Sequence, residues 1–313
     1  MSESNLRKGV VAGLSAAILL MSAAFAPAPV FAWGAEGHRV TGLVAAELMT
    51  ARARLRLNEI IPGADLGDIA NYADLNRATL AMLIPNSERW HWDNQPICET
   101  LTFEQYCPKG DCASARVPVL AKILADFTNP PEIRAMAARL LVHFIGDIHQ
   151  PLHTADDGDA GGNFKNILLP GATNPRRLHA VWDSEFVKLT LRGSSEREFA
   201  LQLVSRFRGK EAREWQKTDI RDWMNESYEL SKSVTYSKLP TFVCREAWTA
   251  TPVELPQSYV DSAVEIIPTQ LAKAGARIAA VLNKALDPNP YVEGPVVAPP
   301  VVQPNSISKS LQQ

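Results

Sequence analysis

The amino-acid sequence predicts an all-α fold, a single domain built from many helices. Apolar residues recur at three- and four-residue spacing over most of the chain, and strand signals are scarce. Helical spacing is found in Glu36–Met49, Val117–Phe127, Glu132–His149, Leu178–Leu191, Glu211–Ser233 and Gln257–Leu286. The segment Asn166–Leu169 fits a short strand as well as a loop, while Gly158–Gly162 and Pro170–Pro175 are typical of loops.

The composition is that of a globular protein without excess charge. Of 313 residues, 46% are hydrophobic, and 32 Lys and Arg residues against 34 Asp and Glu residues give a formal net charge of −2. This length suffices for one large domain. The charge balance excludes a strongly basic protein that coats nucleic acid, so any group that binds phosphate must act locally.

The first 32 residues have the pattern of a secretory signal peptide. Arg7 and Lys8 precede the apolar stretch Val10–Ala26, and small residues end at Ala32, where a signal peptidase would cut. An uncleaved membrane anchor is the alternative, but the apolar stretch is short for a span and no later segment has the pattern of one. We therefore expect a secreted or periplasmic protein whose mature chain begins at Trp33.

The C-terminal end differs in composition from the rest of the chain. Pro and Val dominate after Asp287, and polar residues end the sequence. We expect Pro288–Gln313 to be a flexible tail that joins no core. The folded domain is then predicted to span residues 33–287.

Four cysteines occur in the chain, at positions 98, 107, 112 and 244. An even number in an exported protein favours two disulfides, for which three pairings are possible. Cys107 and Cys112 are close enough to close a small loop, which would leave Cys98 with Cys244. A cysteine zinc site is weakly supported, because the spacing lacks a Cys-x-x-Cys pair.

Histidine and aspartate recur together at helical spacing. His143 and Asp147 stand at i and i+4, and His179 and Asp183 repeat this spacing on a second predicted helix. Each pair supplies an imidazole nitrogen and a carboxylate oxygen from one rigid element, the ligand types that zinc takes. His153 follows closely after the first pair. A metal site is therefore predicted, although a lone pair of this kind is more often a helix-surface contact.

The predicted new N-terminus offers a further possibility. A free Trp33 amine, with a pKa of about 8, and the Trp33 carbonyl oxygen can chelate one metal ion, and His38 could complete its ligands. The alternative is that Trp33 only anchors the core and His38 only begins a helix. These residues alone favour the alternative.

At this point the motifs resemble a known family. The segment Leu141–His153, which reads LVHFIGDIHQPLH, closely resembles the zinc-dependent single-strand-specific nucleases that fungi and plants secrete and that have bacterial relatives. The same resemblance holds, in the same order along the chain, for Trp33–His38, Tyr72–Arg77, Trp90–Trp92, Gly161–Asn163 and His179–Asp183. The C-terminal half fits more loosely, and the segment after His91 departs from the fungal pattern.

The resemblance implies an all-α domain of the phospholipase C and single-strand nuclease type, with a buried cluster of three zinc ions. It implies one zinc ion held by Asp74, His91, His143 and Asp147, a second by His153, His179 and Asp183, and a third by Trp33, His38 and Asp147. It also implies the disulfides Cys98–Cys244 and Cys107–Cys112. His149 is left for a structural role. The acids of the next loop are either stray ligands or, as we expect, solvated: Asp156, Asp157 and Asp159.

The resemblance further implies hydrolysis of phosphodiester bonds in single-stranded DNA and RNA by a zinc-bound hydroxide, with 5′-phosphorylated products. It also allows 3′-nucleotidase activity. Asp74 would orient the attacking water, and Arg77, one turn later, would neutralise charge on the phosphoryl oxygens.

Two further residues are predicted to bind substrate. Asn163 would donate to phosphate, and Trp92 would stack on an unpaired base. These two residues and Arg77 each have a structural alternative: Arg77 as a surface ion pair, Asn163 as a turn residue, and Trp92 as a core residue.

Two rival functions remain open at this stage. A zinc phospholipase C would share the fold and the metal ligands, and an exported zinc-binding protein would have the ligands without catalysis. Arg77 and the region of Trp92 favour the nuclease over the phospholipase, and the complete ligand set with Arg77 beside it argues against a protein without catalysis. With the nuclease prediction we expect single-stranded DNA and RNA as substrates, no stable protein partner, no association with a membrane, and a monomer.

Overall fold

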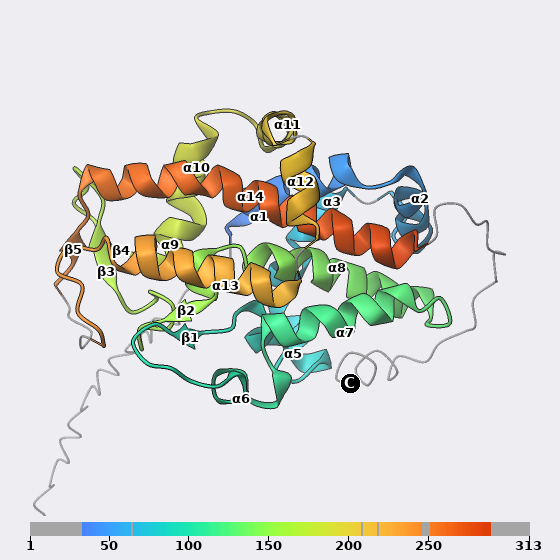
Figure 1. Ribbon diagram of the computed structural model, residues 1–313, viewed down its shortest axis with the longest axis horizontal. Coiled ribbons are helices and arrows are strands. Elements are labelled where there is room, and N and C mark those ends of the chain that lie inside the picture. The colour runs from blue at the N-terminus through green and yellow to red at the C-terminus, as the bar shows by residue number, and fades with distance from the viewer. Residues whose placement is uncertain (1–32, 64, 208, 218, 246–250, 289–313) are drawn as a thin grey trace, which may run out of the picture.

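The computed structural model describes residues 33–63, 65–207, 209–217, 219–245 and 251–288. The predicted signal peptide lies outside these residues, as does all of the predicted tail beyond Pro288. The described part is mainly helical, which confirms the predicted all-α class (Figure 1). No helix within it is both long enough and apolar enough to cross a membrane.

The helices fall into long packing helices and short connecting ones. The α-helices are α1 Ala35–Leu48, α2 Ala51–Ile60, α3 Leu66–Ala70, α4 Tyr72–Leu75, α5 Arg77–Leu83, α6 Phe103–Tyr106, α7 Ala113–Ala125, α8 Pro131–Asp147, α9 Leu178–Ala180, α10 Phe186–Leu191, α11 Glu196–Arg206, α12 Lys210–Trp215, α13 Ile220–Leu230 and α14 Gln257–Leu286. The turns of 3₁₀-helix are η1 Ser87–His91, η2 Pro108–Gly110 and η3 Pro151–His153, and those of π-helix are η4 Val181–Glu185 and η5 Ser231–Tyr236.

The strands of the described part are short and lie at its edge. They are β1 Gln95–Pro96, β2 Ala155–Asp156, β3 Asn166–Leu168, β4 Arg176–Arg177 and β5 Val253–Glu254. β1 pairs with β2 in parallel, and β3 lies between antiparallel β4 and parallel β5. The ambiguous segment Asn166–Leu169 therefore contains a strand, β3.

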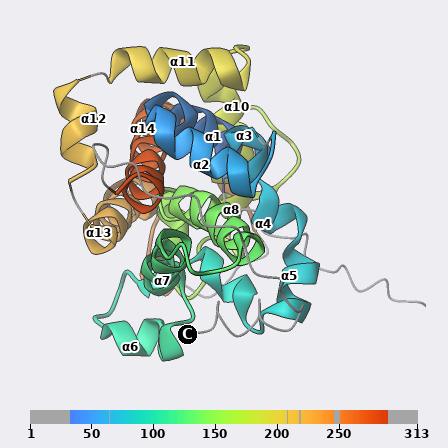
Figure 2. The same cartoon turned by 90° about the vertical axis from the view of Figure 1, so that its right-hand side faces the viewer.

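The long helix α14 is the axis of the packing. It runs the length of the domain (Figure 1), and the end-on view shows α1, α12 and α13 around it, with α7 and α8 below (Figure 2). Its observed bounds are the predicted ones. Pro131 stands at the first position of α8, where a missing N–H costs nothing, and the helix ends at Asp147 before Pro151.

The predicted helix Glu211–Ser233 is wrong as a single helix. The Asp219 carboxylate accepts hydrogen bonds from the backbone N–H groups of Arg221 and Asp222, so a new helix, α13, begins there. Helices α2 to α6 and α11 were not predicted. The sequence does carry a signal for α11, because Ser195 and Glu198 form a capping box at its start.

Two apolar clusters build the core. One surrounds α7 and α8 and includes Trp90 and Phe144, and the other includes Trp33, Trp182 and Tyr259. Side chains of the candidate site contact both clusters: the His91 ring meets Phe144 edge to face at 5.0 Å, and Gly37, beside His38, packs against Trp33. The site therefore sits within rigid, buried surroundings.

Candidate metal centre

Buried histidines and aspartates from six parts of the chain converge in the interior. They form three groups whose possible ligand atoms lie within 4.8 Å of one another: His38 with His143 and Asp147; Asp74 with His91 and His143; and His153 with His179 and Asp183. The side chains are between 0% and 5% exposed. The structure thus brings together every His and Asp residue that the resemblance implied as a ligand.

Asp147 joins two of the groups. Its Oδ1 lies 3.2 Å from His38 Nε2, and its Oδ2 lies 3.0 Å from His91 Nδ1 and 3.3 Å from His143 Nε2. Asp74 lies close to the same pair of imidazoles, with its Oδ1 3.6 Å from His91 Nδ1 and from His143 Nε2. One carboxylate therefore faces two sets of nitrogen ligands, as a bridging ligand would.

The close approach of α1 to α8 depends on Gly146. A Cβ atom at this position would lie 3.0 Å from His38 Nδ1, closer than side chains normally approach. The His38 and His143 rings stack with centroids 4.1 Å apart and an angle of 16° between their planes. Gly146 thus allows two helices to present imidazoles face to face beside Asp147.

The remaining group is built from η3, α9 and η4. His153 Nε2 lies 3.0 Å from His179 Nε2, and His179 Nε2 lies 3.5 Å from Asp183 Oδ2. His179 and Asp183 keep the predicted i, i+4 relationship, although the helix between them passes into a π-turn. Three candidate ligand atoms therefore face one point.

Backbone carbonyls orient three of the imidazoles. The Nδ1 atoms of His143, His153 and His179 each donate to a carbonyl oxygen at 2.6 Å, those of Ala70, His91 and Gly161 respectively. These bonds leave each Nε2 directed at its group. Outer hydrogen bonds of this kind are typical of histidines that bind metals.

The electrostatics of the buried groups favour a bound cation. Burial lowers the pKa of His91 to about 4 and that of His179 to about 3, so both imidazoles are neutral and able to act as ligands. Burial also lowers the pKa of His143, but the charges of Asp147 and Asp74 outweigh it and raise this pKa to about 9. The carboxylates thus hold a positive charge at His143, a role that a metal ion could take.

Buried polar atoms without hydrogen-bond partners also favour a bound cation. His38 Nδ1 and Nε2 and Asp147 Oδ1 are buried and have no hydrogen-bond partner among the described residues. Leaving such atoms unpaired costs about 1–3 kcal/mol each. Imidazole nitrogens and carboxylate oxygens in this arrangement fit zinc ligands better than the all-oxygen sites of calcium or magnesium.

The predicted N-terminal ligand, Trp33, lies beside the group of His153, His179 and Asp183. Trp33 is fully buried, and the backbone N–H of the next residue, Gly34, donates to Asp183 O at 2.8 Å. A Cβ atom on Gly34 would lie 2.7 Å from Ser184 Oγ, so glycine permits this close contact. The backbone of Trp33 is thereby held next to residues that belong to the centre.

The other predicted site residues lie around the centre. An Arg77 terminal nitrogen lies 3.1 Å from Asp74 Oδ1, and the Arg77 side chain is 20% exposed. Trp92 is half-buried, with its ring 6.3 Å from that of His91. Asn163 is half-buried and donates through Nδ2 to Ala160 O, a bond within its own turn. That bond fits the structural alternative for Asn163, although Gly161 of the same turn contacts His179.

His149 points away from the groups, as its structural role requires. Its Nδ1 donates to Ile145 O at 2.6 Å, and its Nε2 accepts from an Arg277 terminal nitrogen at 2.8 Å. Arg277 is fully buried and also binds both carboxylate oxygens of Glu226. This network fixes the end of α8 against α14.

The expectation that the loop acids are solvated is wrong for Asp157 and Asp159, which are 4% and 9% exposed. Asp159 Oδ1 accepts from Tyr236 Oη and from Gly162 N, each at 2.8 Å. Asp157 Oδ1 accepts from Arg245 N, and Asp156 Oδ1 accepts from three backbone N–H groups of the loop. These acids hold the loop in shape.

Sequence reasoning missed Gln150. This side chain is fully buried and donates to Asp183 Oδ1 at 2.7 Å. Gln150 stands between His149 and Pro151 in the motif Leu141–His153, but the sequence does not show which residue its side chain contacts.

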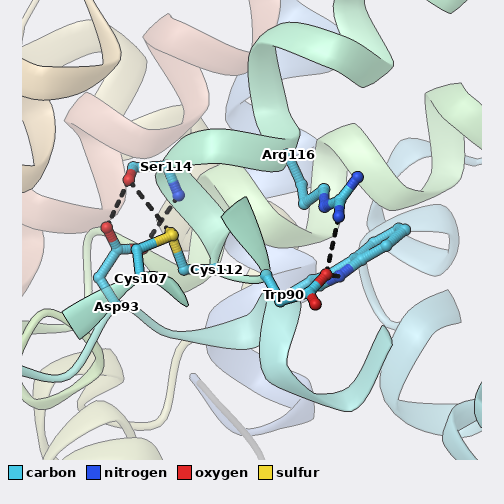
Figure 3. The surroundings of a disulfide bond; sticks show 7 residues. Trp90, Asp93, Cys107, Cys112, Ser114 and Arg116 are labelled. Atoms are coloured by element: carbon cyan, nitrogen blue, oxygen red, sulfur yellow. Dashed lines mark hydrogen bonds and ion pairs between the residues drawn. A yellow bond between two sulfur atoms is a disulfide. The ribbon is translucent and has the colours of Figure 1, made fainter. Parts of the chain in front are cut away.

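Both implied disulfides are present, Cys98–Cys244 and Cys107–Cys112. Figure 3 shows the second beside Asp93, which accepts from Ser114 N at 2.9 Å. Asp93 N in turn donates to His153 O at 2.9 Å. The disulfide and these bonds hold the segment after His91 alongside the segment after His153, so both imidazoles are fixed from outside.

Comparison with known proteins identifies the family. The model of the S1/P1 nuclease family matches residues 33–287. Nuclease PA3 of Penicillium sp is 28% identical over 277 residues, 80% of this chain and 97% of that protein. Nuclease S1 of Aspergillus oryzae is 26% identical over 274 residues (81% and 91%), and Endonuclease 4 of Arabidopsis thaliana is 25% identical over 285 residues (84% and 92%). With the family model covering the whole described domain, this chain belongs to the S1/P1 nuclease family.

Proposed function

We propose that this nuclease is a zinc-dependent endonuclease that hydrolyses phosphodiester bonds of single-stranded DNA and RNA and leaves 5′-phosphorylated products. The observation that carries the proposal is Asp147, whose two oxygens face His38 on one side and His91 on the other. A buried carboxylate shared in this way suits closely spaced metal ions. The family of the chain and its relatives named endonuclease support the reaction class.

We propose three zinc ions with the following ligands: Asp74, His91, His143 and Asp147; His153, His179 and Asp183; and the Trp33 amine and carbonyl, His38 and Asp147. The three groups of buried His and Asp side chains support this assignment. Zinc supplies Lewis acidity and lowers the pKa of water that it binds toward neutrality. The chain itself has a net charge of −2, so local cations would also attract phosphate to an otherwise acidic protein.

Arg77 and Asp74 would act on the scissile phosphate. The guanidinium group of Arg77 is held near the centre by Asp74 and is partly exposed, so it can donate to phosphoryl oxygens that gain charge in the transition state. Asp74, 3.6 Å from two imidazoles, would also orient the attacking water. Positioning and charge stabilisation are the main contributions that a protein makes to such a reaction.

Trp92 and Asn163 would bind the substrate strand. Trp92 is half-buried beside His91, so part of its ring can stack on an unpaired base. Asn163, on the turn that orients His179, would donate to phosphate. A base that is paired and stacked in a duplex cannot reach Trp92, which supports the preference for single strands.

The protein would work outside the cytoplasm. Two disulfides in the structure suit an oxidising compartment, periplasmic or extracellular, and removal of residues 1–32 would free the Trp33 amine.

The test is digestion by the mature chain, residues 33–313, with measured zinc content. We expect three zinc ions per chain, cleavage of single-stranded DNA and RNA well above that of duplex DNA, and 5′-mononucleotide products. A chelator should abolish cleavage, and zinc should restore it. Vesicles of phosphatidylcholine are assayed in parallel. Hydrolysis of the lipid without cleavage of nucleic acid would replace the nuclease with a phospholipase C, and zinc binding without either reaction would leave a non-catalytic zinc-binding protein.

A further inference from the structure

Gln150 uses both ends of its amide in the interior. Its Oε1 accepts from Leu152 N at 2.6 Å and caps the short helix η3, while its Nε2 donates to Asp183 Oδ1 at 2.7 Å. The side chain is 0% exposed. Gln150 therefore connects the segment that carries His153 to the carboxylate that completes the same group.

The two oxygens of the Asp183 carboxylate have different partners. Oδ1 accepts from Gln150, whereas Oδ2 is the oxygen that lies 3.5 Å from His179 Nε2. A carboxylate that accepts a fixed hydrogen bond through one oxygen cannot rotate freely about its last bond. The bond therefore selects Oδ2 as the oxygen that faces His153 and His179.

The backbone at Gln150 is itself held on both sides. The preceding residue, His149, is fixed through its ring, whose Nδ1 donates to Ile145 O at 2.6 Å and whose Nε2 accepts from Arg277 at 2.8 Å. The following residue is Pro151, which restricts the backbone. Gln150 is thus a rigid donor.

Other candidate ligands are also held by hydrogen bonds from outside the groups. Backbone carbonyls orient His143, His153 and His179. A carboxylate needs a donor where an imidazole needs an acceptor, and for Asp183 that donor is Gln150.

We propose that Gln150 is a positioning residue that holds Asp183 with Oδ2 directed at the zinc ion bound by His153 and His179. The inference rests on the proposed function, because it needs that zinc ion. It predicts that loss of the amide donor weakens one zinc site and leaves the other two unchanged. Outer hydrogen bonds to metal ligands contribute about 10–100-fold in metal affinity.

The experiment measures zinc affinity by competition with a chromophoric chelator and zinc content by mass spectrometry. The variant is Gln150→Met, which keeps the side-chain length and removes both polar ends of the amide, the donor to Asp183 and the acceptor that caps η3. The matched control is Gln270→Met, because Gln270 is also buried and donates to His149 O on the other side of the same segment without contacting Asp183. Thermal unfolding of each metal-free protein shows whether the two substitutions disturb the fold equally.

We expect the wild-type protein and Gln270→Met to bind three zinc ions with the same affinities, and Gln150→Met to lose about 10–100-fold in one of them. If Gln150→Met does not fold, Gln150→Asn replaces it, since its shorter amide cannot reach Asp183. Three unchanged affinities in the Gln150 variant, or equal losses in both variants, would overturn the inference alone. A wild-type protein that binds no zinc would overturn the proposed function and the inference with it.

Discussion

His38 and Asp147 face each other across the contact between α1 and α8, with 3.2 Å between Nε2 and Oδ1 and no exposure of either side chain. Among the described residues neither atom has a hydrogen-bond partner of good geometry. The contact packs α1 against α8, the helix that carries His143 and Asp147, so a displacement of either helix would move His38 away from Asp147.

This contact makes Gly146 a sensitive position. Gly146→Ala should favour the isolated helix by about 1 kcal/mol, but its Cβ would lie 3.0 Å from His38 Nδ1 and displace that ring. Gly146 is not a ligand itself but sets the position of the ligand His38, so we expect zinc affinity at the His38 group to fall about tenfold. The metal-free protein should be no less stable. Zinc competition and thermal unfolding of both forms test this, and unchanged zinc affinity would contradict the displacement.

The N-terminal amine gives a second prediction. A chain that retains one alanine before Trp33 has no free amine at that residue, which should remove one zinc ion and most of the nuclease activity. The backbone N–H of Gly34 donates to Asp183 O, and Gly34 lies close to Ser184, so there is little space beside Trp33 for an added residue. The measurement is zinc content and single-strand cleavage, with the same alanine added at the C-terminus as control. Full activity of the extended chain would show that the amine is not a ligand.

Arg77 should affect the chemical step more than substrate binding. Arg77→Met is expected to lower kcat by about 10²–10³, the usual loss for a donor to a developing anion, while three zinc ions remain bound. Arg89→Met, at an exposed arginine of η1, is the control. Steady-state kinetics on an oligonucleotide separate kcat from KM. A change in KM alone would assign Arg77 to ordinary phosphate binding.

Asp159 should make stability fall with rising pH in the acid range. Burial raises the pKa of Asp159, although Gly162 N and Tyr236 Oη donate to it. The folded protein therefore keeps this proton to a higher pH than the unfolded chain, whose pKa is about 4. Between these two pKa values the unfolded state binds fewer protons, so the group's contribution to the free energy of unfolding falls as pH rises.

The variant Asp159→Asn lacks this titration and can keep the acceptor oxygen. Its stability relative to wild type should therefore increase as pH rises from about 4, and then stay constant above the folded pKa. Urea unfolding of both proteins at matched pH values measures the difference. A difference that does not vary with pH would contradict the raised pKa.

The two disulfides should differ in their contribution to stability. Cys98–Cys244 spans 146 residues of sequence and Cys107–Cys112 spans 5. Loop-closure entropy predicts stabilisation of about 5 kcal/mol for the first and about 2 kcal/mol for the second. Replacing each pair by serine and comparing urea unfolding tests this order. A larger loss for the short disulfide would mean that its role in holding the segment after His91 outweighs the entropy.

Much of the helical framework could be predicted because its signals are local. The bounds of α14 follow from apolar periodicity, and the end of α8 follows from Pro151. The single helix Glu211–Ser233 failed because the capping carboxylate of Asp219 competes with helix continuation, a local signal that periodicity does not contain. The short helices around Asp74 lack enough residues to show a period at all.

The sequence by itself determined which residue types are available to the site, because imidazoles and carboxylates stand at helical spacing within recognisable motifs. Only the tertiary structure decided that Asp147 faces two groups at once, that Gln150 holds Asp183, and that Asp159 is buried rather than solvated. The reason is physical. Spacing along a helix sets the direction of a side chain, whereas its partner belongs to another element whose distance is set by packing, here by the absence of a side chain at Gly146.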